Sequence, residues 1–272
     1  MKKIVQQEEV LTRLNKIIAH RSEYSRREAD QLIIEGFVKI NGELVVDPGT
    51  QVASRDEITV RGKKLAPENA KYTVIAYHKP KGEIVSKNDP QGRKIIFDSL
   101  GNEFKKFTPI GRLDYASEGV LLLTDSSQIA DTLMNSDLER QYNVKIKGFV
   151  TPAMERGMMN GLDLRNALAG AHALTKQKAM KFAPFVGYKI IKNAPNFSRL
   201  SIILNEGQNR EIRRFFAYFR SEVLDLKRVA YGFVHLNALP AGKTRYLNKA
   251  EYNKLHEFLK GDRNATKNNT EE

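Results

Sequence analysis

One aspartate has neighbours that suit it to chemistry. Residues 111–119 read Gly-Arg-Leu-Asp-Tyr-Ala-Ser-Glu-Gly, and the apolar run Val120-Leu121-Leu122-Leu123 follows directly. A carboxylate beside a buried strand needs a partner, because an unpaired buried charge is costly. Asp114 is therefore either a turn residue that pairs with Arg112 or a reactive carboxylate, and for an isolated aspartate the turn is the commoner case.

A group of arginines near residue 210 has a composition suited to binding anions. The spacing predicts a helix from about Asn209, with a buried face made of Ile212, Phe215, Phe216 and Phe219. Arg210, Arg213 and Arg214 cluster at its N-terminal end, where the helix dipole disfavours cations. Because an arginine fits a phosphate or a carboxylate as a two-pronged donor, we interpret the cluster as anion-binding.

A tyrosine lies on a strand between these two groups. Residues 140–146 alternate in polarity, which predicts a strand with Tyr142, Val144 and Ile146 on one face. From the residues alone, Tyr142 is a core or interface aromatic.

The N-terminal part carries two predicted helices. The first covers residues 11–19, and the second begins at Ser25, where Ser25 and Glu28 have the spacing of a capping box. Arg26 and Arg27 lie in the first turn of the second helix. They are either a solvated helix start or, with the exposed amides, a contact for phosphates.

Short strands follow these helices. Residues 38–40 and 43–46 are joined by Asn41-Gly42, the favoured two-residue hairpin turn, and residues 51–52 and 57–60 have strand character. A β-type run begins at Tyr72 and ends in a turn that contains Lys79 and Lys81. These two lysines are open to two interpretations, a solvated turn or a phosphate contact.

Charge and composition narrow the classes of function. The chain has 45 Lys and Arg against 32 Asp and Glu, a net charge of +13. Residues 1–70 hold 12 and 11 of these, and residues 71–272 hold 33 and 21. The excess favours a polyanionic partner, with nucleic acid first, and places the basic surface on the larger part.

The residues that the chain lacks also exclude classes of site. It has no cysteine, which excludes disulfides, thiolate zinc sites and cysteine nucleophiles and fits a reducing cytoplasm. No apolar run approaches the roughly 20 residues that a membrane helix needs. No signal peptide is evident at the N-terminus.

The N-terminal elements resemble an S4 RNA-binding domain. The resemblance covers residues 11–64 and rests on four pieces in order: Arg13-Leu14-Asn15-Lys16, Ser25-Arg26-Arg27-Glu28-Ala29, Ile34-Glu35-Gly36-Phe37-Val38 and Ile40-Asn41-Gly42. It implies two helices with a small sheet. It also implies binding of structured RNA by Arg13, Lys16, Arg21, Arg26 and Arg27.

The chain as a whole, over residues 11–259, resembles the bacterial ribosomal RNA pseudouridine synthases that carry an N-terminal S4 domain. Gly111-Arg112-Leu113-Asp114 with Ser117-Glu118-Gly119 matches their central motif, and Asn209-Arg210-Glu211-Ile212-Arg213-Arg214 matches their later arginine motif. The segments at residues 78–83, 88–93 and 97–98 are most similar to members that act on 23S ribosomal RNA.

This resemblance implies roles for individual residues. Asp114 would be the catalytic aspartate, Tyr142 would stack on the target base and help remove the C5 proton, and Arg213 would pair with Asp114 and keep it ionised. Arg112, Arg210 and Arg214 would bind RNA. The reaction cleaves the N1–C1′ bond, turns the uracil and rejoins it through C5, so it is redox-neutral and we expect neither cofactor nor metal. Asp114 could attack either the ribose or the base in the first step, and the sequence does not distinguish the two.

The expected architecture is α+β. An S4 domain over residues 10–70 precedes a catalytic domain over residues 71–260, which has a mixed, largely antiparallel sheet flanked by helices, and a polar, disordered tail over residues 261–272. We expect a cytoplasmic monomer that binds large-subunit ribosomal RNA, free or in an assembling particle, and no membrane. Two alternatives are a non-catalytic S4-type ribosome-binding factor, which leaves Asp114, Tyr142 and Arg213 unexplained, and a binder of acidic membranes, which would need a basic amphipathic helix.

Overall fold

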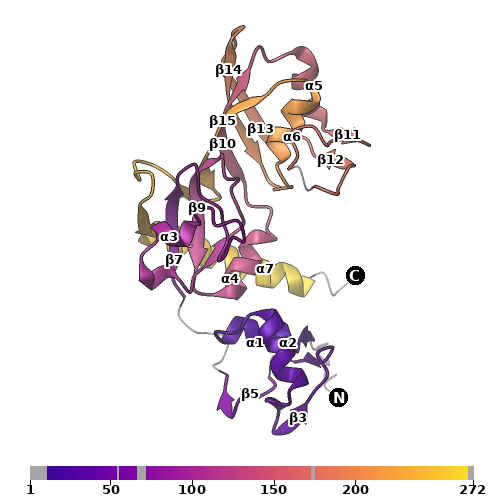
Figure 1. Cartoon of the computed structure of the whole chain (residues 1–272), viewed down its shortest axis with the longest axis vertical. Helices are drawn as coiled ribbons and strands as arrows, with labels where there is room; N and C mark the ends of the chain where they lie inside the picture. Colours follow the sequence, from indigo (N-terminus) through magenta and orange to yellow (C-terminus); the bar gives the residue numbers. More distant parts are fainter. Residues whose placement is uncertain (1–10, 54, 66–71, 173–174, 269–272) are drawn as a thin grey trace, which may run out of the picture. The chain divides into compact units, whose positions relative to one another are not determined.

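A computed structural model describes residues 11–53, 55–65, 72–172 and 175–268, with side chains to Gly261 (Figure 1). The chain forms two compact units, which divide between Tyr72 and Thr73 except that Ser126–Gln128 group with the first. The division lies two residues from the expected domain boundary. Within the described residues, no helix has the length and apolarity to cross a membrane.

The first unit contains two helices and short strands, as predicted. Its elements are β1 (Thr12–Arg13), α1 (Leu14–Arg21), α2 (Arg26–Ile34), β2 (Val38–Ile40), β3 (Glu43–Val45), β4 (Gln51–Val52), β5 (Ile58–Val60) and β6 (Lys63–Lys64). The sheet order is β3-β2-β5-β6, and β1 pairs separately with β4. The first helix begins at Leu14 and not at residue 11, because Thr12 and Arg13 pair with Val52 and Gln51.

Local sequence signals account for most of this unit. The Ser25 amide donates to Glu28 Oε2 at 2.7 Å and the Glu28 amide donates to Ser25 Oγ at 3.3 Å, which is the predicted capping box. Asn41 and Gly42 have φ values of 51° and 90°, as their hairpin turn requires. Ala29, Leu32 and Ile33 are buried in the core of the unit.

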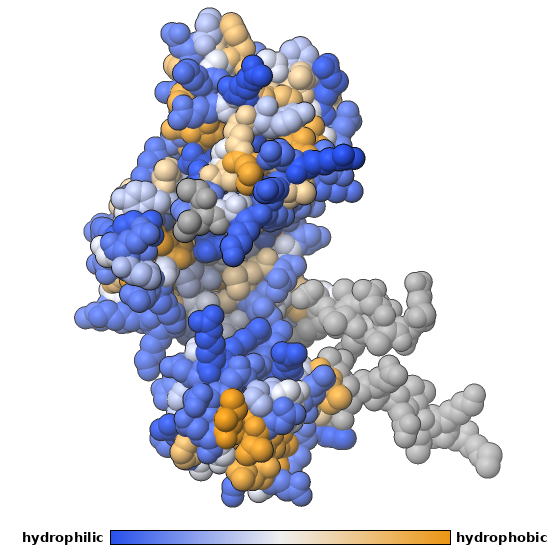
Figure 2. Space-filling model, turned by 45° about the vertical axis from the view of Figure 1, so that its right-hand side comes forward, coloured by the Kyte–Doolittle hydropathy of each residue, from blue (hydrophilic) through white to orange (hydrophobic). Residues whose placement is uncertain are grey.

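Apolar side chains also lie on the surface of the first unit. Figure 2 shows an apolar patch there, and the exposed large apolar residues of the unit are Leu11, Ile34, Phe37, Leu44 and Val46. The Arg61 guanidinium lies over the Phe37 ring, with 5.0 Å between its carbon and the ring centroid. A cation on an aromatic face is favourable even where both are exposed, and it covers part of this patch.

The second unit contains the remaining elements. The strands are β7 (Val74–Lys79), β8 (Thr108–Ile110), β9 (Glu118–Thr124), β10 (Arg140–Lys147), β11 (Leu162–Leu164), β12 (Met180–Phe182), β13 (Gly187–Lys192), β14 (Phe197–Leu204), β15 (Val223–Tyr231), β16 (Val234–His235) and β17 (Thr244–Tyr246). The helices are α3 (Ile96–Ser99), a 3₁₀ turn (Asn102–Phe104), α4 (Ser127–Met134), α5 (Pro152–Asn160), α6 (Glu211–Tyr218) and α7 (Lys249–Asn268).

A nine-stranded sheet forms the centre of this unit. Its order is β13-β14-β10-β15-β9-β7-β17, with β16 added on β15 and β8 on β9. The pairs are antiparallel except β15 with β9, so the predicted mixed, largely antiparallel sheet is confirmed. Tyr142, Val144 and Ile146 are buried on one face of β10, in a core that includes residues of α5 and α6.

The two halves of this sheet join through very few residues. β9 and β15 pair in parallel at Glu118 with Lys227 and at Gly119 with Arg228. Gly119 has a φ of +121°, and a Cβ there would lie 2.1 Å from the carbonyl oxygen of Arg228. Since no side chain fits at that spacing, glycine is required at position 119. The Arg228 Nε donates to the Val120 carbonyl at 2.7 Å and supports the join.

The C-terminal helix α7 extends into the polar tail. The backbone of α7 is helical to Asn268, whereas we expected a disordered tail from residue 261. Leu255 is fully buried and fixes the preceding turns. The expected disorder of residues 261–272 stays a prediction.

Candidate active site

Three elements of the second unit bring the predicted catalytic residues together. Asp114 lies in the loop between β8 and β9, Tyr142 lies on β10, and Arg213 lies in the first turn of α6. All three line one cavity of about 80 Å³, together with the apolar side chains Leu113, Leu204, Ile212 and Leu226. Residues separated by up to 99 positions in the sequence thus share one small, partly apolar site.

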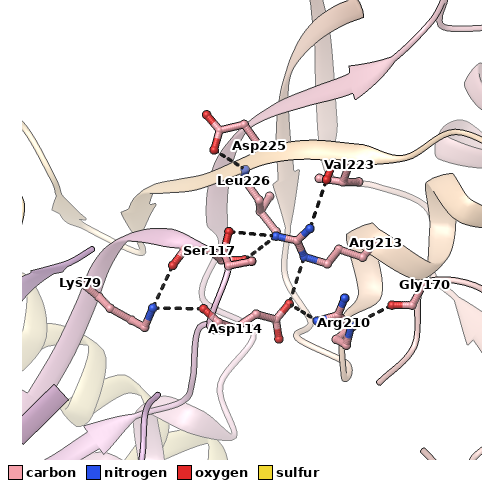
Figure 3. A network of polar contacts seen from close by, with 10 residues as sticks. Lys79, Asp114, Ser117, Gly170, Arg210, Arg213, Val223, Asp225 and Leu226 are labelled. Carbon is pink, nitrogen blue, oxygen red and sulfur yellow. Dashed lines mark hydrogen bonds and ion pairs between the residues drawn. The ribbon is translucent and has the colours of Figure 1, made fainter. Parts of the chain in front are cut away.

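The Asp114 carboxylate is held by two arginines (Figure 3). Oδ2 accepts a hydrogen bond from Arg213 Nε at 3.2 Å and pairs with an Arg210 terminal nitrogen at 3.4 Å. The expected pairing of Arg213 with Asp114 is present. Arg112, the partner that a simple turn would use, has an exposed side chain and lines the adjoining groove.

Arg213 connects Asp114 to two other segments. Its terminal nitrogens donate to the Ser117 hydroxyl at 3.0 Å, to the Ala116 carbonyl at 3.2 Å and to the Val223 carbonyl at 3.2 Å. Burial lowers the pKa of Arg213 from its ordinary value, and the Asp114 charge opposes this shift. An arginine remains protonated under such conditions, so Arg213 supplies a fixed positive charge beside the carboxylate.

Arg210 adopts a backbone conformation that few non-glycine residues take. Its φ and ψ are 52° and 32°, in the left-handed region, at the N-cap of α6. This costs about 1–2 kcal/mol for a residue with a Cβ. The side chain donates from Nε to the Gly170 carbonyl at 2.8 Å while it pairs with Asp114. Local strain of this kind is common where surrounding contacts fix a functional side chain.

Lys79 is a residue of this site that the sequence did not reveal. It is fully buried, and its Nζ donates to the carbonyls of Pro80, Asp114 and Ser117 at 2.9, 3.1 and 2.9 Å. Burial lowers its pKa to about 8, against the opposing charges of nearby acids. Three carbonyl acceptors require the three protons of an ammonium group, so protonated Lys79 fixes both ends of the Asp114 turn.

Two lysines at the end of β7 were open to interpretation as phosphate contacts: Lys79, its last residue, and Lys81 in the turn that follows. Neither is free to bind a phosphate. Lys81 pairs with Asp225 at 2.6 Å, and Lys79 is occupied inside the loop (Figure 3). The continuous apolar run of β7 could have signalled the burial of Lys79, because this strand is buried on both faces. Sequence alone does not show which carbonyls a buried lysine meets.

Arg214 was expected to bind RNA, and its position contradicts this. Only 1% of its surface is exposed, and it donates to the carbonyls of Ala167 at 2.7 Å and Gln177 at 3.1 Å. Burial lowers its pKa from the ordinary value. The helical spacing groups Arg214 with Arg210 and Arg213, but its side chain points into the protein because the carbonyls of Ala167 and Gln177 supply acceptors there.

Glu211 is also buried at the start of α6. Its carboxyl accepts a hydrogen bond from the Gln208 amide at 3.0 Å. Burial, followed by a hydrogen bond shared with Glu206, raises the pKa of Glu211 to about 8. Glu211 is therefore mainly protonated at neutral pH, and the one full negative charge at the mouth of the cavity is that of Asp114 among the described residues that line it.

A larger groove opens from the cavity. It has a volume of about 970 Å³ and shares Arg112, Asp114 and Arg210 with the smaller site. Its described lining carries five cationic side chains and one acid: Lys87, Arg93, Arg112, Lys176, Arg210 and Asp114. The charge of the second unit is therefore concentrated in part around the carboxylate, where a polyanion would be attracted.

The predicted RNA-binding residues of the first unit lie at or near its surface. Arg13, Arg26 and Arg27 are exposed, and Lys16 and Arg21 are partly exposed. These positions are compatible with phosphate contacts, and their role stays a prediction.

Comparison with known proteins assigns both units. The family model of the RNA pseudouridylate synthases matches residues 73–218, and the S4 domain model matches residues 12–58. The first match covers more than half of the chain and includes Asp114, Tyr142 and Arg213. The chain belongs to the RNA pseudouridylate synthases. It is an RNA pseudouridine synthase with an N-terminal S4 domain, and the resemblance read from the motifs is confirmed.

Relatives of this synthase agree over nearly the whole chain. An uncharacterized RNA pseudouridine synthase of Helicobacter pylori (strain ATCC 700392 / 26695) is 53% identical over 248 residues, 91% of this chain and 94% of the relative. The ribosomal large subunit pseudouridine synthase B of Bacillus subtilis (strain 168) is 34% identical over 94% of this chain and 100% of its own. A crystal structure of a pseudouridylate synthase superposes with a TM-score of 0.61 at 26% identity, covering 89% of this chain and 99% of that one.

Proposed function

We propose that this synthase converts a specific uridine of 23S ribosomal RNA to pseudouridine, with Asp114 as the nucleophile and without a cofactor. The observation that carries the proposal is the Asp114 carboxylate, paired with Arg213 at 3.2 Å inside a cavity that Tyr142 also lines. The name of the Bacillus subtilis relative, a ribosomal large subunit enzyme, supports the choice of RNA.

The first step needs a carboxylate that is charged and aimed. Asp114 forms a bond to the nucleoside as the N1–C1′ bond breaks, and a fixed guanidinium beside it favours the ionised, correctly oriented nucleophile. Arg213 has that role because three further acceptors restrict its guanidinium. Lys79 acts behind it as a positioning residue, since it binds the carbonyl of Asp114 and not its carboxylate.

The later steps concern the base. The uracil turns within the cavity and forms a C5–C1′ bond, and the bond between Asp114 and the nucleoside breaks, which returns the free carboxylate. The C5 proton leaves and N1 gains a proton, so that atoms and electrons balance without a redox partner. Tyr142 is placed to stack on the uracil, which replaces the stacking that the base loses when it leaves the RNA. Tyr142 is 9% exposed and lines the cavity, and its hydroxyl is the group that would help to remove the C5 proton.

The groove explains how a polymer reaches so small a site. Lys87, Arg112 and Lys176 along this groove of about 970 Å³ bind the phosphates on either side of the target, while one nucleotide enters the cavity. Arg93 and Arg210 of the same lining pair with Asp89 and Asp114. The S4 unit adds contacts to structured RNA through Arg13, Arg26 and Arg27. We infer that the protein acts in the cytoplasm as a monomer, on free or assembling large-subunit RNA.

Mapping of pseudouridines in 23S ribosomal RNA tests this function. Cells that lack the gene are supplied with the wild-type chain, with Asp114→Asn, or with Asp163→Asn as a matched control at an exposed strand position. With Asp114→Asn we expect one pseudouridine to be missing from the RNA, although the variant still binds RNA. With Asp163→Asn we expect that pseudouridine to be present, as with the wild-type chain. A map that is the same with Asp114→Asn as with the wild type would reject Asp114 as nucleophile, and a position lost from another RNA would reject the substrate.

A further inference from the structure

A group of cations lies on the catalytic sheet, on the face opposite to Tyr142. Along β10, β13 and β14, alternate residues point to opposite faces. One face packs beneath α5 and α6 (Figure 1) and includes Tyr142 and Ile146. The other face carries several cations, among them Lys145, Lys189, Lys192 and Arg199.

Three of these cations surround a single aromatic ring. The Nζ atoms of Lys145 and Lys192 lie 4.2 and 4.3 Å from the ring centroid of Phe197, and the Arg199 guanidinium carbon lies 5.5 Å from it. The ring faces attract cations, so Phe197 holds the three charges together at the surface. We call Lys145, Lys189, Lys192, Arg199 and Phe197 the basic sheet face.

The strand register brings like charges directly opposite each other. Lys145 is the cross-strand partner of Arg199, and Arg199 is in turn the partner of Lys192. Like charges at such positions are destabilising. Among the described residues, none of these four cations forms an ion pair with an acid of this chain. On its other side Lys145 is the cross-strand partner of Asp225, which pairs with Lys81. The cations around Phe197 can therefore accept an anion from outside the chain.

Protection of the sheet edge accounts for only part of this arrangement. Lysines on an edge strand discourage pairing with other chains, and β13, which carries Lys189 and Lys192, is the edge strand. Lys145 and Arg199 lie on β10 and β14, which are paired on both sides. Edge protection gives no reason for cations on those two inner strands.

We propose that the basic sheet face binds the phosphate backbone of ribosomal RNA at a second place, separate from the active-site groove. The groove lining includes none of its residues within the described chain. The occupant follows from charge complementarity, since clustered Lys and Arg bind phosphates without regard to sequence and the substrate is itself a long polyanion. The proposal rests on the proposed function for the identity of that RNA. Its consequence is that a large RNA wraps onto a face that a short substrate does not reach.

Binding and turnover by full-length chains test this surface. One variant combines Lys145→Gln, Lys192→Gln and Arg199→Gln. The control combines Lys105→Gln, Lys106→Gln and Lys260→Gln, which removes the same charge at exposed positions elsewhere on the same unit. Each is measured with full-length 23S ribosomal RNA and with a short hairpin around the mapped uridine, over a range of salt concentrations.

We expect the basic-sheet-face variant to bind full-length RNA about tenfold more weakly than the control, with a salt slope smaller by about 2. Its turnover of the hairpin should equal that of the control. Equal affinities and slopes of the two variants for full-length RNA would overturn the proposal. An equal loss on hairpin and full-length RNA would also overturn it, because the residues would then act through the groove or the fold.

Two further outcomes distinguish this proposal from membrane binding and from a failure of the proposed function. Binding of the wild type to phosphatidylglycerol vesicles that is lost in the variant, with unchanged RNA affinity, would assign the face to a membrane and overturn the proposal. Failure of the wild type to modify the hairpin would count against the proposed function alone, because the affinity for full-length RNA is measured independently. A Phe197→Leu chain should lose part of the same affinity, and no loss there would reject the role of the ring.

Discussion

Helices α2 and α6 begin alike in the sequence and use their charges in opposite ways. Each has arginines at its start and a glutamate that accepts a hydrogen bond from the backbone amide three residues earlier. At α2, Arg26, Arg27 and Glu28 are all exposed. At α6, Glu211 and Arg214 are buried and Arg213 lies against Asp114.

The difference comes from what surrounds each helix start. Around α6, a carboxylate and several loop carbonyls lie within reach, so its arginines are used inside the protein to fix the site. Around α2, the capping box satisfies the backbone amides and leaves the guanidinium groups of Arg26 and Arg27 on the surface. An arginine at a helix start therefore predicts anion contact, and the tertiary surroundings decide whether that anion belongs to the protein or to RNA.

Arg213→Ala gives the largest expected effect. The rate of the chemical step should fall about 100- to 1,000-fold, since a preorganised charged donor to the reacting carboxylate is removed. The measurement is single-turnover conversion of a uridine-containing transcript, with the melting temperature as a control for folding. A rate within threefold of the wild type would show that Asp114 does not depend on Arg213.

Arg214→Met separates two neighbouring arginines. It leaves the carbonyls of Ala167 and Gln177 buried without their donor, so the free energy of unfolding should fall by about 2 kcal/mol or more. Urea unfolding measures this change. The rate per folded molecule should stay close to the wild type, and a stable but slow variant would place Arg214 in the chemistry instead.

Glu211→Gln tests the buried acid against the exposed Glu28. The pKa of Glu211 is about 8 when folded and ordinary when unfolded, so the folded state binds the extra proton between about pH 4.5 and 8. The stabilising contribution is complete below that window and is lost as pH rises through it. The melting temperature of the wild type should therefore fall relative to Glu211→Gln from pH 5 to pH 8.

The matched change Glu28→Gln should give a difference that is nearly independent of pH over the same range, because Glu28 is exposed. The measurement is the melting temperature of the wild type, Glu211→Gln and Glu28→Gln at each pH. A constant difference between the wild type and Glu211→Gln would mean that Glu211 is charged in the folded protein.

Arg26→Gln combined with Arg27→Gln gives the smallest expected effect on turnover. RNA affinity should weaken a few-fold, with a salt slope smaller by about 1–2, while the maximal rate is unchanged. Lys39→Gln with Lys63→Gln removes the same charge from exposed positions of the same unit and serves as the control. A lower maximal rate for the Arg26 and Arg27 variant would contradict the proposal that the arginines of α2 act only in RNA binding.

Features encoded by a few adjacent residues were predictable from the sequence. Asn41-Gly42 and the pair Ser25 and Glu28 carry their own backbone geometry, and both appear in the structure as predicted. The alternation that buries Tyr142, Val144 and Ile146 also follows directly from strand periodicity. The family and the two-part organisation followed from motifs several residues long.

Features that depend on distant contacts were not predictable in this way. Helical spacing puts Arg210, Arg213 and Arg214 together, but only the carbonyls of Ala167 and Gln177 turn Arg214 inward. Lys79 reads as part of a polar turn, yet it meets carbonyls 35 and 38 positions away. The expected partner of Asp114 within its own turn, Arg112, was displaced by arginines about 100 positions later.

The absence of a side chain at Gly119 sets how closely the two halves of the sheet approach each other near the active site. Asp114 belongs to the half of the sheet that contains β9, while Tyr142 and Arg213 belong to elements of the other half, beyond β15. The spacing between the Asp114 carboxylate and the Arg213 guanidinium thus depends on the close approach of Gly119 to the Arg228 backbone. A single methyl group there would thicken the joint while each half kept its own core. We therefore expect the rate of this enzyme to depend on the backbone distance between Gly119, five residues after Asp114, and Arg228.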